Sequence, residues 1–62
     1  MTGFEKVFSE METRPLQDWL RTAQHQLTKY QSGAVHEILV AGISTAATEL
    51  LFRYRESIRN LP

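Results

Sequence analysis

The stretch that decides the fold is GAVHEILVAGISTAATELLFRYRESIRNL, residues 33–61. If this stretch is helical, each residue advances about 100° around the axis, and its apolar side chains occupy two adjoining faces. Together these faces span about 200°, although a surface helix needs an apolar stripe of only about 100°. We therefore expect one face to pack inside the chain and the other to bind protein. The inner face holds Val35, Leu39, Gly42, Ile43, Ala46 and Leu50, and the outer face holds Val40, Ala47, Leu51, Tyr54 and Ile58.

The chain is short and electrically neutral, with 62 residues, seven basic and seven acidic side chains. A core of this size rarely supplies more than about 3–5 kcal/mol, so disulfides, a metal or a partner subunit usually reinforce it. The sequence has no cysteine, which excludes disulfides and thiolate metal sites. We expect no cofactor and no metal, and association with a second copy remains as the reinforcement.

Helical periodicity runs along the whole chain, and no alternating strand pattern interrupts it. Proline disrupts a helix interior but is tolerated in a first turn, so Pro15 either starts a second helix or kinks a long first arm. Gly33 follows Ser32 at a clear turn signal, and a short connection there favours antiparallel neighbours. The pattern predicts an all-α single domain, residues 1–62, built on an antiparallel helical hairpin. The expected helices cover about residues 3–12, 15–31 and 34–60.

Small residues in the middle of the last helix predict a docking site for the single tryptophan. Glycine costs about 1 kcal/mol relative to alanine inside a helix, so Gly42 needs compensation from close packing. The hairpin register places Trp19 over the patch formed by Gly42 and Ala46. The same register, continued before the proline, places Phe8 opposite Ile58 and brings the arginines of the last helix beside the N-terminal glutamates.

Two architectures can cover the outer face. In the leading one, two hairpins press their outer faces together and form a homodimeric four-helix bundle. In the alternative, the chain is a compact three-helix monomer whose first helix folds back at Pro15 and covers the outer face itself. The solution mass distinguishes the two architectures.

Residue types that carry enzymatic chemistry are present, but their spacing in the sequence does not bring them together in one site. His25 lies on the polar face of the second helix and His36 just past the turn, an arrangement that does not predict a shared metal. Ser44 has no base at catalytic spacing, and no glycine-rich phosphate loop occurs. A chain this short can hardly enclose a substrate pocket. We predict that the protein is not an enzyme and has no catalytic, cofactor-binding or metal-binding residues.

Protein binding is therefore the predicted function, in the form of a small helical adaptor or regulator. It would act by self-association, and the amphipathic helix of a client protein could dock on the same apolar groove. Self-association and client binding would then compete. The residues predicted at the protein interface are Val40, Ala47, Leu51, Phe52, Tyr54 and Ile58.

The alternative function is nucleic-acid binding through the segment Phe52-Arg53-Tyr54-Arg55, because aromatic rings can stack on bases while arginines hold phosphates. The zero net charge disfavours this function. Arg53 and Arg55 also point about 200° apart on a helix, so one chain does not gather them into a patch. The candidate contacts are Phe52, Arg53, Arg55 and Arg59.

A cytoplasmic location without membrane contact is the remaining expectation. The N-terminal residues alternate apolar and acidic side chains, unlike the basic and then apolar start of a signal peptide. The most apolar run, residues 38–52, contains Glu49 and is shorter than the ~20 residues of a membrane span.

Overall fold

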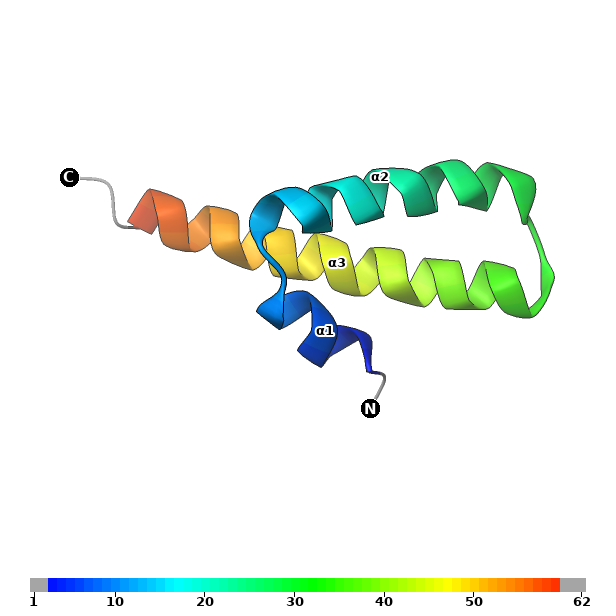
Figure 1. Cartoon of the computed structure of the whole chain (residues 1–62), viewed down its shortest axis with the longest axis horizontal. Coiled ribbons are helices and arrows are strands. Elements are labelled where there is room, and N and C mark those ends of the chain that lie inside the picture. The colour runs from blue at the N-terminus through cyan, green and yellow to red at the C-terminus, as the bar shows by residue number, and fades with distance from the viewer. Residues whose placement is uncertain (1–2, 60–62) are drawn as a thin grey trace.

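The computed structural model describes residues 3–59, and within that range it contains three helices and no strand. They are α1 (Phe4–Glu10), α2 (Thr13–Lys29) and α3 (Gly33–Arg59). Helices α2 and α3 form an antiparallel hairpin, and α1 packs against α3 (Figure 1). The all-α prediction and the three helices are confirmed, whereas Asn60, expected at the end of the last helix, lies outside the described residues.

The first arm is broken, and the break lies before the proline. Met11 and Glu12 are extended, with ψ angles of 146° and 158°, so α1 ends at Glu10 and the chain turns back. Pro15 then falls in the first turn of α2, where its missing N–H costs no intrahelical hydrogen bond. The predicted break or kink is confirmed as a break. The pairing of Phe8 with Ile58 is wrong, because α1 returns along α3 (Figure 1) and Phe8 packs with Leu16 and Ala46.

A short connection joins the two long helices at the other end of the hairpin. Helix α2 stops at Lys29, where the N–H of Tyr30 still donates to the carbonyl oxygen of Gln26 at 3.1 Å. Gly33 has a φ of +90°, which glycine adopts without the steric cost that a Cβ atom imposes. The turn predicted at Gly33 is confirmed, although the glycine begins α3 and is not the residue that directly follows α2.

The core is small and lies where α1 meets the hairpin. Phe8, Leu16 and Ala46 are buried together, and Trp19 packs against them. A Cβ atom at Gly42 would lie only 2.6 Å from Cη2 of Trp19, so the indole ring occupies the space that the glycine leaves. The predicted docking of the tryptophan on the small-residue patch is confirmed.

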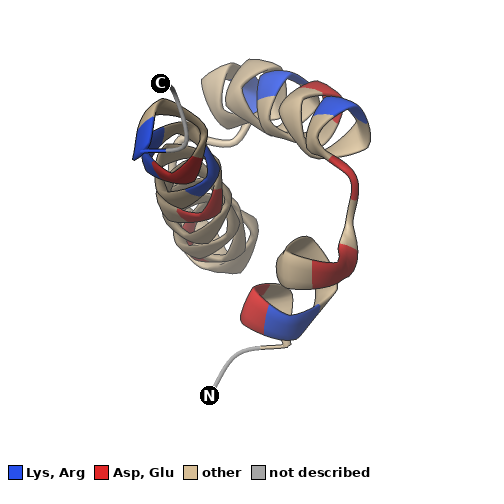
Figure 2. Ribbon diagram, turned by 90° about the vertical axis from the view of Figure 1, so that its left-hand side faces the viewer, with Lys and Arg blue, Asp and Glu red and all other residues tan. Residues whose placement is uncertain are grey.

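The molecule is elongated, with extents of 46 × 24 × 15 Å. Helices α1 and α2 both pack on α3, and in the view along the long axis the three helices lie at the corners of a triangle (Figure 2). The radius of gyration of the molecule is 12.9 Å, against about 10.6 Å expected for a compact domain of this length. Each helix therefore keeps one side that no other helix covers.

Candidate protein-binding face

The outer face of α3 is an apolar strip that no helix among residues 3–59 covers. Its five residues recur at a spacing that keeps them on one side of the helix, opposite the side that contacts Trp19. Leu51 exposes 51% of its surface, although leucine is among the residue types most often buried. Val40, Ala47, Leu51, Tyr54 and Ile58 are all exposed.

Helix α1 folds back, as the three-helix alternative required, but it covers a different surface. The rings of Phe8 and Trp19 lie 4.7 Å apart, and Phe4 reaches within 3.4 Å of the position that a Cβ atom of Gly42 would take. These contacts place α1 beside the inner face of α3. The prediction that a folded-back first helix shields the outer face is wrong, because aromatic packing on Gly42 draws it to the other side.

The accessible surface of the chain is larger than a compact monomer of this mass would show. It amounts to 5045 Å², whereas a folded monomer of 7.2 kDa exposes about 4,100 Å². The excess of roughly 900 Å² is close to the ~800 Å² that each partner buries in a standard protein–protein interface. The area that is left uncovered is thus sufficient for one interface of ordinary size.

A groove runs beside the outer face, between the start of α2 and the second half of α3. Its α2 wall consists of Thr13, Gln17 and Leu20, and two of these three side chains are polar. Its α3 wall includes the outer-face residues Leu51 and Tyr54. An apolar strip bordered by polar side chains is the usual anatomy of a protein interface.

Phe52 stands apart from the other five predicted interface residues. It is 60% exposed and lines a second groove, where α3 runs beside α1. Glu5 and Glu49 contribute carboxylates to that groove, and Ser44 and Thr48 contribute hydroxyl groups. The structure brings Val40, Ala47, Leu51, Tyr54 and Ile58 onto one strip and places Phe52 on another side of the helix.

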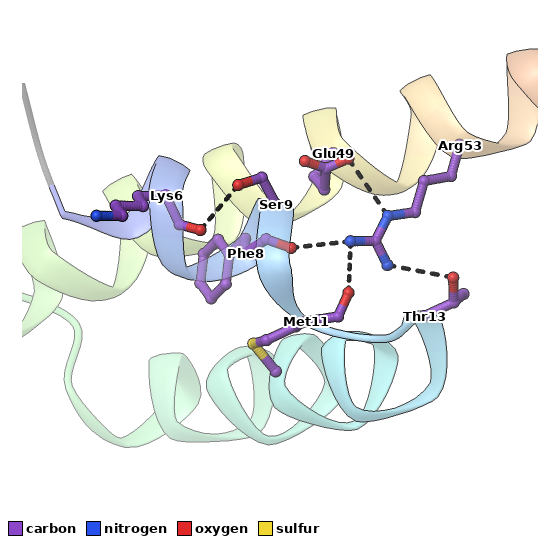
Figure 3. Close-up of polar contacts among 7 residues, drawn as sticks. All are labelled: Lys6, Phe8, Ser9, Met11, Thr13, Glu49 and Arg53. Carbon is purple, nitrogen blue, oxygen red and sulfur yellow. Dashed lines mark hydrogen bonds and ion pairs between the residues drawn. The ribbon is translucent and has the colours of Figure 1, made fainter.

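Arg53 is the structural residue that the sequence did not reveal. Its guanidinium group donates to the carbonyl oxygens of Phe8, at 2.9 Å, and Met11, at 2.6 Å, at the end of α1 (Figure 3). It also donates to the Thr13 hydroxyl at 3.2 Å and to the Glu49 carboxylate at 3.3 Å. The Phe8 carbonyl also accepts a hydrogen bond from the N–H of Met11 at 3.2 Å, so the arginine adds a second donor there. One arginine from α3 thus holds both the end of α1 and the start of α2.

The sequence predicted that arginines of the last helix lie beside the N-terminal glutamates, and the structure differs in the partners of Arg53. An arginine of α3 does lie beside the N-terminal segment, but its partners there are backbone carbonyls and a hydroxyl group. Glu49, its carboxylate partner, lies on the same helix four residues earlier. A hydrogen bond to a backbone carbonyl leaves no signature in a sequence, because every residue carries that group.

The same bonds bear on the candidate nucleic-acid contacts. All three guanidinium nitrogens of Arg53 donate inside the chain, so this side chain is occupied. Arg59 lies 3.8 Å from Glu56 and stays mostly exposed, and Arg55 is exposed. Basic and acidic residues alternate along the helices in Figure 2, without a face of one sign in that view. Nucleic-acid binding by Phe52, Arg55 and Arg59 stays a prediction.

The histidines lie apart from any gathered set of titratable groups. Nδ1 of His36 lies 3.1 Å from the carbonyl oxygen of Tyr30, to which it can donate, and thereby ties the first turns of α3 to the end of α2. His25 is exposed on α2. Within residues 3–59, no three metal-ligating side chains come together.

Helix α3 is also long and apolar enough, by length and composition, to cross a membrane. Its most apolar segment has a mean hydropathy of 1.3, and 11% of that segment is buried. The core helix of a small soluble protein satisfies the same criteria, and α3 carries five charged side chains between residues 49 and 59. Membrane insertion is therefore an outcome to test.

Comparisons of the chain with protein-family models, with curated proteins and with solved structures found no match. The burial, charge and shape of the surface are accordingly the basis on which a function can be assigned. Of these, the uncovered outer face of α3 is the most specific.

Proposed function

We propose that the protein is a small non-enzymatic adaptor or regulator that pairs with a second copy through the outer face of α3, forming a four-helix bundle. The observation that carries this proposal is the exposed apolar strip on α3, which α1 and α2 leave uncovered. Burying apolar surface contributes about 25 cal/mol per Å², so covering this strip with a second copy would stabilise the pair.

Client binding is the second part of the proposal. An amphipathic helix of another protein presents the same chemistry as α3, an apolar stripe with polar flanks. Such a helix would compete with the second copy for Leu51 and Tyr54, which also line the groove beside α2. The proposed site of action is the cytoplasm, where the ratio of client to protein would set which pairing dominates.

The experiment is a measurement of solution mass across a concentration series, with one variant on the outer face and one off it. Leu51→Asp places a charge at the centre of the proposed interface, and we expect a monomer at concentrations where the natural chain is a dimer. Ile38→Asp is the matched control, because Ile38 is on the same helix and 57% exposed but lies outside the outer face. It should leave the dimer intact. A natural chain that stays monomeric throughout would contradict the proposal.

A further inference from the structure

We infer that the second copy binds antiparallel, with a two-fold axis near residue 49 of α3, an inference that rests on the proposed self-association. The outer face contains both large and small side chains, and their order along the helix decides the orientation. In an antiparallel pair, a residue a given number of positions before the two-fold axis lies opposite the partner residue that is the same number of positions after it. In this register Val40 lies opposite the partner's Ile58, and Ala47 lies opposite the partner's Leu51.

Side-chain size favours this arrangement over a parallel one. Ala47 facing the partner's Leu51 sets a small residue against a large one on both sides of the axis, which is how layers fill at native density. Ser44, at the edge of the strip, would likewise face the partner's Tyr54. A parallel pair would set Leu51 and Tyr54 against their own copies and Ala47 against alanine, which crowds one level and leaves a void at the next. The chain already uses small against large inside the hairpin, where Trp19 fills the space at Gly42.

Charge favours the same orientation. Glu37 is exposed near the start of α3, and Arg59 is exposed at its end, on the same flank of the outer face. In an antiparallel pair the two flanks coincide, and the partner's Arg59 comes to within about two residues, or ~3 Å of height, of Glu37. The positive end of each helix dipole also meets the negative end of its neighbour. A parallel pair would gather the arginine-bearing ends of both copies.

The area is sufficient for such a pair. The surface that the chain exposes beyond that of a compact monomer is about as large as one side of a standard interface. The strip from Val40 to Ile58 covers 19 residues, and the 18 steps between its ends amount to about 27 Å of helix at 1.5 Å per residue. The polar wall of the groove at Thr13 and Gln17 would then form the rim on the α2 side.

Disulfide cross-linking between single-cysteine variants tests the orientation, and the natural chain has no cysteine to interfere. Two cysteines can join only when their Cα atoms approach within about 7 Å. We expect a mixture of Val40→Cys and Ile58→Cys, one of them carrying a mass tag, to form the mixed disulfide. Val40→Cys alone should not cross-link above the background set by Asp18→Cys, an exposed position on α2. Both positions on α3 are exposed within one chain, so neither change disturbs its core.

Each other outcome overturns a different statement. Self-cross-linking of Val40→Cys without the mixed product shows a parallel pair and overturns the orientation while leaving self-association in place. A dimer by mass that yields neither product overturns the register. A monomer at every concentration, with or without anionic lipid vesicles, overturns the proposed function, and a vesicle-bound monomer identifies a membrane surface as the occupant instead.

Discussion

Two regions of α3 differ in how far other helices cover their side chains, although both are rich in apolar residues. At the junction with α1, Phe8 is 2% exposed and Arg53 donates four hydrogen bonds within the chain. On the outer face, Leu51 and Ile58 keep about half of their surface in contact with solvent. The junction is covered by α1 and α2, whereas neither of these helices covers the outer face.

The difference shows why a single chain cannot cover both faces. Helix α1 has only seven residues, and its two phenylalanines are drawn to the indole ring of Trp19. Aromatic pairs of this kind contribute about 0.5–1.5 kcal/mol beyond the area that they bury. Once α1 is placed there and held by Arg53, no element among residues 3–59 is left to reach the other side of α3.

The largest expected loss of stability follows from a substitution that disrupts the packing at the junction of α1 with α3. Gly42→Leu would place side-chain atoms where Trp19 and Phe4 now lie, and even the first added carbon would be 2.6 Å from the indole ring. Overpacking typically costs about 1–3 kcal/mol, which is a large part of the ~3–5 kcal/mol available to a core of this size. We expect the cooperative thermal transition, followed by circular dichroism, to be lost or strongly lowered.

Gly3→Ala is the control for that prediction, because a Cβ atom at Gly3 would meet nothing within 4 Å. It should change the melting temperature little. If Gly42→Leu kept both its helicity and its oligomer mass, close packing between α2 and α3 at this glycine would be disproved.

A smaller effect is expected when the clamp on α1 is removed. Arg53→Met keeps much of the apolar stem but removes the guanidinium donor from the carbonyl groups of Phe8 and Met11. The Phe8 carbonyl would keep only its bond from the N–H of Met11. Hydrogen bonds that involve a charged group contribute about 1.5–3 kcal/mol, and the partial exposure of this one puts the expected loss near the lower value. Urea denaturation monitored by Trp19 fluorescence measures the change, since α1 packs on that ring.

Two further variants make the clamp prediction specific. Arg53→Lys keeps the charge but replaces a planar fork of donors with a single ammonium group, so it should recover only part of the lost stability. Arg55→Met removes an exposed arginine two residues away and should shift stability by less than about 0.5 kcal/mol. Equal losses for Arg53→Met and Arg55→Met would show that the hydrogen bonds at the junction contribute nothing measurable.

The smallest expected effect is a dependence of the melting temperature on protein concentration, which the outer face should produce and the junction should not. A partner that binds only the folded state stabilises it, and each tenfold rise in concentration above the dissociation constant adds up to about 1.4 kcal/mol. The melting temperature of the natural chain should therefore rise with concentration, and that of Leu51→Asp should not. Arg53→Met should be less stable than the natural chain at every concentration while keeping the same slope. If the melting temperature of the natural chain did not change with concentration, this would contradict pairing through the outer face.

Much of the fold could be predicted because it depends on local spacing. The apolar repeat of α2, the proline in its first turn and the glycine before α3 are all visible within a few residues of one another. The close packing at Gly42 could also be predicted. Glycine destabilises a helix interior unless a neighbour packs closely against it, and the single tryptophan of the chain does so. The direction of α1 could not be predicted, because it depends on which of two surfaces of α3 gives the better contact.

The amino-acid sequence by itself determined that this protein is helical, that its two long helices pair as a hairpin, and that α3 carries more apolar surface than one neighbour covers. These follow from the period of the α-helix and from residue size. Only the tertiary structure decided that α1 returns along the inner face and that Arg53 ties its end to α3. The bonds that hold it end on backbone carbonyls, which are common to all residues, so their choice depends on three-dimensional proximity and not on residue type.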